Sequence, residues 1–204
     1  MIYDYFSQRY AAIADVPGAV VECGLGLGVS FVMLGHLVGK EGKGRTLYGC
    51  DSFEGWPQPS ETDSQSPRKP KRGEWAVPEE HFLERLKHSM LQEKYPELKI
   101  ELVRGFYDQS LPDFPDEPIA FLHADCDLEP SYKAVLENLW PKVSVGGVVL
   151  FDEYLEFPQR EEYGFGTISK WPGAYKAISE FFAGRPEKVQ HDPLVDKYFV
   201  VKQQ

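Results

Sequence analysis

The sequence predicts an α/β fold with a Rossmann-like, doubly wound sheet, mostly parallel with an antiparallel strand at its C-terminal end. Short apolar runs alternate with segments of helical periodicity, as expected for buried parallel strands joined by crossover helices. A glycine-rich turn follows the first of these runs and opens a helix. Two later runs, ending at Ala124 and Phe151, are each followed by carboxylates. Together these three observations define the fold class.

Composition and charge narrow the class of protein. The 204 residues predict one domain over 1–204, with 42% hydrophobic and 26% charged residues. The net charge of −10 argues against nucleic acid or an anionic membrane as a partner, but it suits a cationic ligand or a metal. No apolar stretch is long enough to span a membrane and no secretory signal opens the chain, so we expect a cytoplasmic protein. The three cysteines end strand-like runs, which indicates reduced, buried thiols.

The opening segment, 1–18, is predicted to hold an N-terminal helix. Tyr3, Phe6, Tyr10 and Ile13 recur at helical spacing, and Pro17-Gly18 ends the pattern. We expect this helix to pack on the core.

The first strand, over 19–23, leads into the loop Gly24-Leu25-Gly26-Leu27-Gly28 and a helix. This arrangement is typical of a nucleotide site, because glycines let the backbone approach a ligand closely. A dinucleotide fingerprint needs a third glycine where Val29 stands, which argues against NAD. The next strand, over 45–50, ends at Asp51, a distance of about 20 residues from the loop that suits hydrogen bonds to ribose hydroxyls. A turn or a helix cap is the alternative role for Asp51.

The segment 54–77 combines prolines with a basic cluster of Arg68, Lys69, Lys71 and Arg72. It is predicted to be a mobile, lid-like surface insertion rather than a core element. The basic cluster either meets an anionic group of the substrate or forms a solvated face. A second polar and aromatic segment, 155–170, is another candidate for substrate contact.

The middle of the chain continues the alternation. A helix is predicted over 79–95 with one apolar face, formed by Phe82, Leu86, Met90 and Leu91. A strand over 99–103 follows, and Gly105-Phe106 stands at its tip, where Phe106 packs either on an adenine or in the core. Further helices are predicted from Pro130 and over 171–182, and a last strand pair over 188–190 and 197–201.

Four carboxylates are expected to converge on one site. Asp125 and Asp127 follow the strand that ends at Ala124, and Asp152 and Glu153 follow the next strand. Ligands bind beyond the carboxyl ends of parallel strands, so these ends should share a site. Carboxylates this close repel one another and call for a cation, for which a hard divalent metal is suited. The alternative is that polar residues simply end two buried strands.

The motifs taken together resemble the macrocin O-methyltransferase family of class I S-adenosylmethionine (SAM) methyltransferases. The matching stretches are V-V-E-C-G-L-G-L-G-V-S (20–30), C-D-S-F-E-G-W-P (50–57), A-D-C-D (124–127), L-W-P-K-V-S-V-G-G (139–147) and D-E-Y (152–154). The resemblance implies SAM as cofactor, bound by Glu22, Gly24, Leu25, Gly26, Gly28, Ser30, Asp51, Ser52, Gly105 and Phe106. It implies a site for Mg²⁺ or another divalent metal at Asp125, Asp152 and Glu153. The family usually has aspartate where Glu153 stands, which leaves the metal in question.

The resulting prediction is a SAM-dependent O-methyltransferase, assisted by a divalent metal, that methylates a hydroxyl of a small molecule such as a sugar or natural product. A metal lowers the pKa of a bound hydroxyl, and a base then takes the proton. Asp125 and Asp127 are the candidate bases, with His123 next. The alternatives are a metal-independent methyltransferase of the same fold, an NAD-binding oxidoreductase, a metal-dependent phosphoesterase and a SAM-binding protein without activity. A homodimer is left open.

Overall fold

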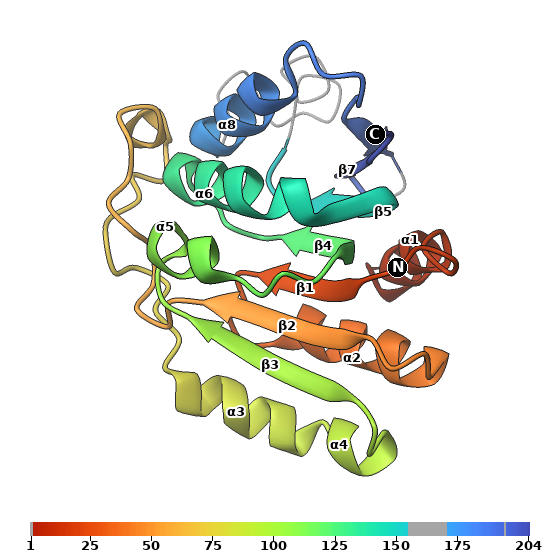
Figure 1. Ribbon diagram of the computed structural model, residues 1–204. Coiled ribbons are helices and arrows are strands. Elements are labelled where there is room, and N and C mark those ends of the chain that lie inside the picture. Colours follow the sequence, from red (N-terminus) through yellow and green to blue (C-terminus); the bar gives the residue numbers. More distant parts are fainter. Residues whose placement is uncertain (1, 155–170, 194) are drawn as a thin grey trace.

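The structure, a computed structural model, describes residues 2–154, 171–193 and 195–204. Its centre is a seven-stranded sheet in the order β3-β2-β1-β4-β5-β7-β6 (Figure 1). The strands are β1 (Ala19–Cys23), β2 (Thr46–Asp51), β3 (Lys99–Arg104), β4 (Ile119–Ala124), β5 (Val143–Phe151), β6 (Gln190–Asp192) and β7 (Lys197–Val201). The five strands from β3 to β5 are parallel, and β7 pairs antiparallel with β5 and with β6. The predicted fold class is therefore confirmed.

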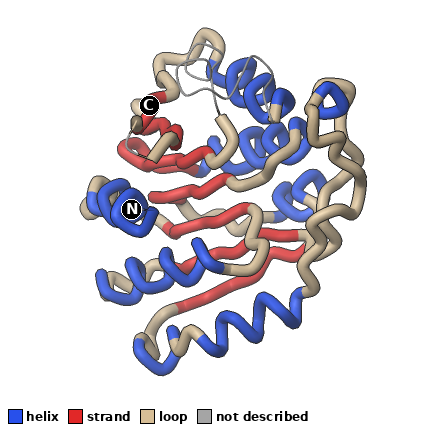
Figure 2. Tube along the Cα trace, turned by 180° about the vertical axis from the view of Figure 1, so that it is seen from behind, coloured by secondary structure: helices blue, strands red, loops and turns tan. Residues whose placement is uncertain are grey.

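Helices cover both faces of this sheet because alternate strand residues point to opposite sides. Val20 packs with one set of helices and Val21 with the other. On the Val20 side are α1 (Ile2–Ala11), α2 (Val29–Glu41), α3 (Glu79–His88) and α4 (Leu91–Lys94), nearer the viewer in Figure 2. On the Val21 side are α5 (Tyr107–Ser110), α6 (Glu129–Leu139) and α8 (Pro172–Phe182). Single 3₁₀ turns lie at Asp63–Gln65, Leu111–Asp113 and Trp140–Lys142.

The N-terminal helix packs on the core, as expected. Phe6, Tyr10 and Ile13 are buried, whereas Tyr3 points outward. The edge of the Phe6 ring faces the His123 imidazole, with ring centroids 4.9 Å apart. In the described residues, no helix is long and apolar enough to cross a membrane.

The prediction of one continuous helix over 79–95 is wrong, because the helix is interrupted at Met90. Met90 has a φ of 55° and a side chain that is 54% exposed, so it does not belong to the apolar face. The left-handed turn lets Leu91 instead reach the core, beside Gly35 of α2. The last strand pair also differs in position, since β6 covers Gln190–Asp192 rather than 188–190.

The insertion over 54–77, gold in Figure 1, lies along the edge at which the parallel strands end. It is more closely packed than its composition suggests. Trp56 is buried in the core and pairs through its backbone with Gly73 and Glu74. Asp63 is 1% exposed and accepts backbone hydrogen bonds from Ser60 and Glu129. The segment thus contributes to the core, and its predicted mobility stays a prediction. The other candidate for substrate contact, 155–170, lies outside the described residues.

Candidate active site

A cavity of about 1160 Å³ opens at the carboxyl ends of the parallel strands. The loops after β1 and β2 line one end of it, and the loops after β4 and β5 line the other. This is the edge at which open α/β sheets bind their ligands. The cavity therefore brings the glycine loop and the acidic strand ends into one continuous space.

The glycine loop approaches the neighbouring strand too closely for a side chain. A Cβ atom on Gly24, whose φ is 92°, would lie 1.8 Å from the backbone oxygen of Asp125. Of the residues predicted to bind the cofactor in this loop, Gly24, Leu25, Gly26 and Ser30 line the cavity. Gly28 does not; it precedes α2 with a φ of 76° and packs against the Phe82 ring.

Asp51 fixes the shape of this loop. Its carboxylate accepts hydrogen bonds from the backbone N–H of Leu25 at 2.7 Å and of Phe53 at 2.8 Å, and it lines the cavity. A carboxylate has about four lone-pair sites, so it can also accept from a ligand hydroxyl. The turn role and the ribose role proposed for Asp51 are thus compatible. Ser52 also lines the cavity and donates to the Gly55 carbonyl oxygen at 3.0 Å.

The loop after β3 also contributes to the cavity wall. Gly105 and Phe106, which are predicted to bind the cofactor, both line the cavity. Phe106 is half-buried rather than part of the core, so its ring is available to a ligand.

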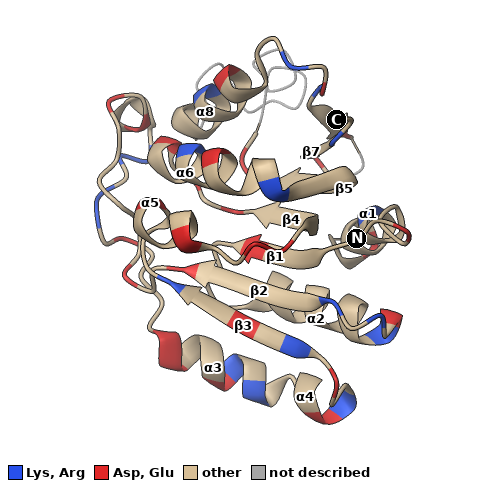
Figure 3. Ribbon diagram, in the orientation of Figure 1, with Lys and Arg blue, Asp and Glu red and all other residues tan. Residues whose placement is uncertain are grey.

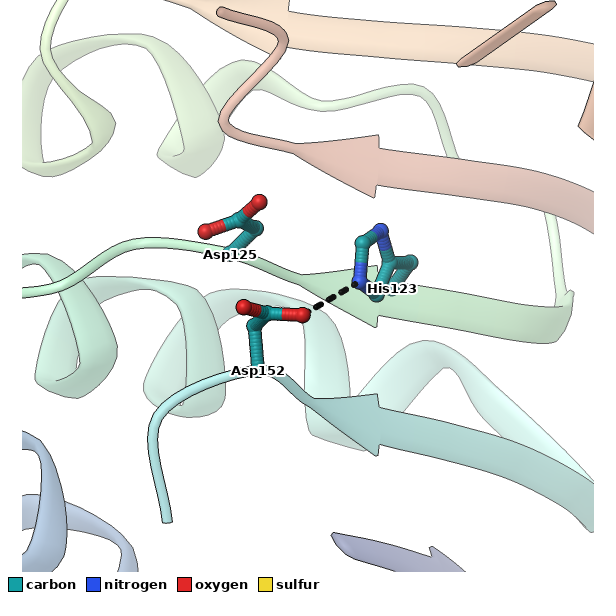
Figure 4. A group of neighbouring side chains, drawn as sticks. All are labelled: His123, Asp125 and Asp152. Carbon is teal, nitrogen blue, oxygen red and sulfur yellow. Dashed lines mark ion pairs between the residues drawn. The ribbon is translucent and has the colours of Figure 1, made fainter. Parts of the chain in front are cut away.

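The four predicted carboxylates, Asp125, Asp127, Asp152 and Glu153, all line the opposite end of the cavity. Figure 4 shows the Asp125 and Asp152 side chains next to each other, with the His123 ring beside them. One ligand atom from each of these three residues lies within 4.8 Å of the others. The convergence predicted for Asp125 and Asp152 is therefore present, and His123 joins them.

Asp152 is held by two cations. Lys197 Nζ lies 2.5 Å from Asp152 Oδ1, and His123 Nε2 lies 3.8 Å from the same oxygen. Burial raises the pKa of Asp152, but the nearby His123 and the Lys197 charge outweigh it, so the pKa lies below its usual value. Asp152 is therefore ionised, and the positive charges of Lys197 and His123 balance its negative charge.

His123 is a buried cation rather than an accessible base. Its Nδ1 lies 2.8 Å from Glu22 Oε1, and its side chain does not line the cavity. Burial lowers the pKa of His123, but the nearby Asp152 and the hydrogen bond with Glu22 have the larger opposite effect and raise the pKa to about 10. Glu22 itself is fully buried and is not among the residues that line the cavity, so its role at the cofactor site stays a prediction.

Glu153 points toward α6. Its carboxylate accepts a hydrogen bond from the Tyr132 hydroxyl at 2.6 Å and one from the backbone N–H of Asp127 at 3.2 Å. Burial and the charges of Asp125 and Asp152 raise the pKa of Glu153 well above its usual range. Burial and the Asp152 charge likewise raise the pKa of Asp125, to about 7. In the described part of the chain neither Asp125 nor Glu153 forms an ion pair with a lysine or arginine, although the His123 charge lowers the pKa of Asp125 in part.

An aromatic group closes the acidic end. Trp56 Nε1–H donates to Asp127 Oδ2 at 2.9 Å, and Trp171 stands edge-on to Trp56 with centroids 5.3 Å apart. Sequence reasoning missed these aromatic residues and Lys197 as site residues. The feature that could have identified Lys197 is its position at the start of β7. Phe151 pairs with Tyr198 in the antiparallel ladder, so the preceding residue, Lys197, lies beside Asp152.

The sheet order, with its antiparallel β7, is that of the class I methyltransferase fold. The chain belongs to the macrocin O-methyltransferase (TylF) family, whose model matches residues 7–163. The resemblance found in the sequence is thus confirmed.

Two curated relatives come from species of Streptomyces. Demethyldecarbamoylnovobiocin O-methyltransferase of Streptomyces niveus is 32% identical over 149 residues, which are 71% of this chain and 55% of the relative. The 8-demethyl-8-(2,3-dimethoxy-alpha-L-rhamnosyl)-tetracenomycin-C 4'-O-methyltransferase of Streptomyces olivaceus is also 32% identical, over 70% of this chain and 55% of its own. The chain thus spans little more than half the length of these relatives.

Solved structures share the fold. The O-methyltransferase NovP superimposes with a TM-score of 0.79 at 24% sequence identity. The superposition covers 99% of this chain and 79% of the NovP chain. The calicheamicin methyltransferase CalS11 gives the same TM-score and identity, covering 98% and 77%.

Proposed function

We propose that this protein is a SAM-dependent O-methyltransferase that methylates a hydroxyl on the sugar of a natural product. The observation that carries the proposal is the single cavity lined by both the glycine loop and the acid cluster. Methyl transfer needs a donor and a hydroxyl in line in one space, and holding them there supplies much of the rate acceleration. The sugar follows from the names of the relatives, one of which specifies a rhamnosyl group.

In this proposal SAM occupies the end of the cavity next to β1 and β2. The backbone of Gly24 to Gly26, together with Ser30, faces the methionine part. Asp51 accepts hydrogen bonds from the ribose hydroxyls, and Phe106 packs on the adenine. SAM bound there would supply its methyl group to a hydroxyl held at the acidic end of the same cavity.

The acceptor hydroxyl must lose its proton as the methyl is transferred, and we assign that proton to Asp125. Asp125 lines the cavity, and in the site without a metal its raised pKa of about 7 lies near neutral pH, where a general base is most effective. Asp127 is already engaged by the Trp56 N–H, and His123 lies behind the cavity wall. The methyl carbon passes from sulfur to oxygen, and S-adenosylhomocysteine leaves.

The acidic end has donor chemistry that fits a divalent metal. Asp125 and Asp152 offer oxygens within 4.8 Å of each other, and among the described residues no lysine or arginine forms an ion pair with Asp125 or Glu153. We propose that Asp125 and Asp152 hold the metal, with Glu153 as the third ligand if its carboxylate turns from Tyr132. When bound, the metal would lower the pKa of the acceptor hydroxyl. His123 shares the group, and in the metal-free site its neighbours raise its pKa, which favours the protonated form without a lone pair for a metal.

A metal-independent methyltransferase is the second candidate. The observation that favours it is the ion pair between Lys197 and Asp152 at 2.5 Å, which supplies a resident cation at the same carboxylate. In this alternative Lys197 and His123 balance Asp152, and Asp125 alone activates the hydroxyl.

The test is calorimetric titration of SAM into chelated protein, with and without Mg²⁺, followed by mass spectrometry of rhamnosides incubated with SAM. Binding of SAM and a mass gain of one methyl group support the proposal. A Mg²⁺ binding heat that is lost in Asp152→Ala supports the metal-assisted form, and methylation without Mg²⁺ supports the second candidate. Absence of SAM binding overturns both.

A further inference from the structure

A row of side chains with alternating charge crosses four neighbouring strands. Glu22 of β1 and His123 of β4 pair in the parallel ladder, and Glu22 Oε1 lies 2.8 Å from His123 Nδ1. His123 Nε2 lies 3.8 Å from Asp152 Oδ1, at the end of β5, and Lys197 of β7 completes the row. Figure 3 shows acidic positions, in red, near the ends of β1 and β4. The row thus joins the strand that leads into the glycine loop to the acid cluster.

Glu22 makes incomplete use of its carboxylate in the core. Its side chain is fully buried, and His123 Nδ1 is the partner of its Oε1. Its Oε2 has no hydrogen-bond partner among the described residues. A buried polar atom without a partner costs about 1–3 kcal/mol, so a carboxylate that served only the fold would be expected to use both oxygens. The contact with His123 is therefore the feature of Glu22 that calls for an explanation.

The His123 ring is fixed from two sides. The Phe6 ring of α1 stands edge-on to it, and Glu22 engages its Nδ1. With Nδ1 engaged, the ring directs Nε2 toward Asp152, as the dashed line in Figure 4 shows. The 3.8 Å between Nε2 and Oδ1 is longer than a hydrogen bond, so His123 attracts the Asp152 carboxylate without blocking its approach to a ligand.

Asp152 is the member of the row that faces a ligand. It lines the cavity with a side chain that is 30% exposed, whereas the His123 and Glu22 side chains behind it are buried. A carboxylate that is held in place before binding loses little orientational freedom when a cation or a hydroxyl binds to it. Groups that orient a metal-binding side chain from behind commonly contribute about tenfold or more to the affinity for the metal.

We propose, on the basis of the methyltransferase function above, that Glu22 is a positioning residue of the acidic end. It holds the His123 ring, and the ring holds the Asp152 carboxylate where the metal and the acceptor hydroxyl bind. Glu22 acts through His123 and touches neither SAM nor the acceptor. The strand that leads into the glycine loop would thereby also set the geometry of the acid cluster.

The first experiment follows carboxyl ¹³C signals of the intact, metal-free protein by NMR. Glu22→Gln keeps the shape of the side chain and removes its charge. We expect it to shift the Asp152 carboxyl signal and the His123 imidazole ¹⁵N signals, and to leave the Asp51 carboxyl signal in place. Glu187→Gln, which changes another buried glutamate outside the cavity, is the matched control. An Asp152 signal that does not move overturns the proposal.

Calorimetric titration of Mg²⁺ tests the consequence for ligand binding. Glu22→Gln should weaken Mg²⁺ binding about tenfold. In a His123→Gln background the same substitution should have no further effect, because its influence passes through the ring. An equal loss in that background would show that the Glu22 charge acts directly, which overturns the positioning role. If the parent protein binds no Mg²⁺, the metal-assisted form of the function fails, and the same cycle measured on the Asp152 signal decides the proposal.

Titration of SAM separates this proposal from the proposed function. Failure of the parent protein to bind SAM counts against the methyltransferase function, while the NMR shifts still decide the role of Glu22. Glu22→Gln should bind SAM within about twofold of the parent protein. A large loss of SAM affinity with an unmoved Asp152 signal would assign Glu22 to the cofactor instead.

A second variant covers the case in which Glu22→Gln does not fold. Asp152→Asn lies at the exposed end of the row and probes the same coupling from the other side. It should shift the Glu22 carboxyl signal, which is assigned in the parent protein by through-bond correlation. A Glu22 signal that stays in place overturns the proposal.

Discussion

Lys197 Nζ and Asp152 Oδ1 lie 2.5 Å apart, and Lys197 also donates to the Asp152 backbone oxygen at 3.3 Å. The register of β5 and β7 makes this contact, because Phe151 pairs with Tyr198 and the chain positions next to them meet at the sheet edge. Asp152 is one of the residues proposed to hold a divalent metal. A lysine at this distance competes with that metal for the same carboxylate, since both are cations.

Replacing Lys197 by methionine should therefore increase the affinity for Mg²⁺. The Lys197→Met variant keeps an unbranched side chain but removes the charge, and the gain should be about tenfold. Calorimetric titration of Mg²⁺ into chelated protein measures it. Lys188→Met, an exposed lysine outside the cavity, is the control. Unchanged or weaker Mg²⁺ binding in Lys197→Met would show that Mg²⁺ does not bind to the Asp152 carboxylate.

Removing the Asp51 carboxylate should weaken SAM binding. Asp51→Ala deletes the acceptor of the Leu25 and Phe53 N–H groups as well as the proposed acceptor of the ribose hydroxyls. We expect a loss of about 1–3 kcal/mol in the free energy of SAM binding, measured by calorimetry. Asp113→Ala changes an exposed aspartate outside the cavity and should leave SAM affinity unaltered. If both variants bind SAM like the parent protein, the cofactor is held elsewhere.

Much of the fold could be predicted from the sequence because buried parallel strands are continuous apolar runs. Val20 and Val21 pack on opposite faces of the sheet, and each needs an apolar neighbour. The break at Met90 was not predictable in the same way. The helical spacing of Phe82, Leu86 and Met90 continues through it, and only the packing of Leu91 against α2 decides that the helix ends.

The carboxylates of the site were predictable because parallel strands bring their C-terminal ends together. The side chains that contact these carboxylates were not predictable in this way. Lys197 comes from an antiparallel strand far along the chain, and its role depends on the register of that pairing. Trp56 belongs to a proline-rich segment that resembles a surface loop, yet it is buried against Asp127. Glu22 follows apolar residues at a strand end but turns away from the cavity to His123.

The rate of methyl transfer should rise with pH until Asp125 is ionised. A general base must be unprotonated to accept the hydroxyl proton, and burial together with the Asp152 charge raises the pKa of Asp125 to about 7. In chelated enzyme at saturating SAM, the rate should increase about tenfold per pH unit below this pKa and level off above it. Single-turnover rates across this range provide the measurement. With Mg²⁺ bound, the midpoint should move to lower pH, because a cation favours the ionised carboxylate.

Substitution identifies the group responsible for that pH dependence. Asp125→Asn should lose both the rate and its rise with pH. Asp127→Asn should keep the rise, because the carboxylate it removes accepts a hydrogen bond from Trp56 and is not assigned the proton. A rise that persists in Asp125→Asn and disappears in Asp127→Asn would transfer the role of base to Asp127.

The insertion over 54–77 should depend on Glu129 for its attachment to the domain. Glu129, at the start of α6, is 4% exposed and accepts hydrogen bonds from Ser60 at 2.7 Å, Lys133 at 2.6 Å and Lys176 at 2.9 Å. Burial raises the pKa of Glu129, but these donors outweigh it and lower the pKa from 4.5 to about 2. The ionised form is therefore favoured by folding.

A depressed pKa stabilises the fold above the ordinary pKa of the group, and this contribution is lost as the pH falls through the folded-state value. Glu129→Gln should thus lower the free energy of unfolding by about 1–3 kcal/mol at pH 7. The difference from the parent protein should narrow as the pH falls from 4.5 toward 2. Urea unfolding at several pH values measures it, with the exposed Glu137→Gln on the same helix as control. A deficit that stays constant with pH would show that the Glu129 charge does not hold the insertion, and that only the shape of the side chain matters.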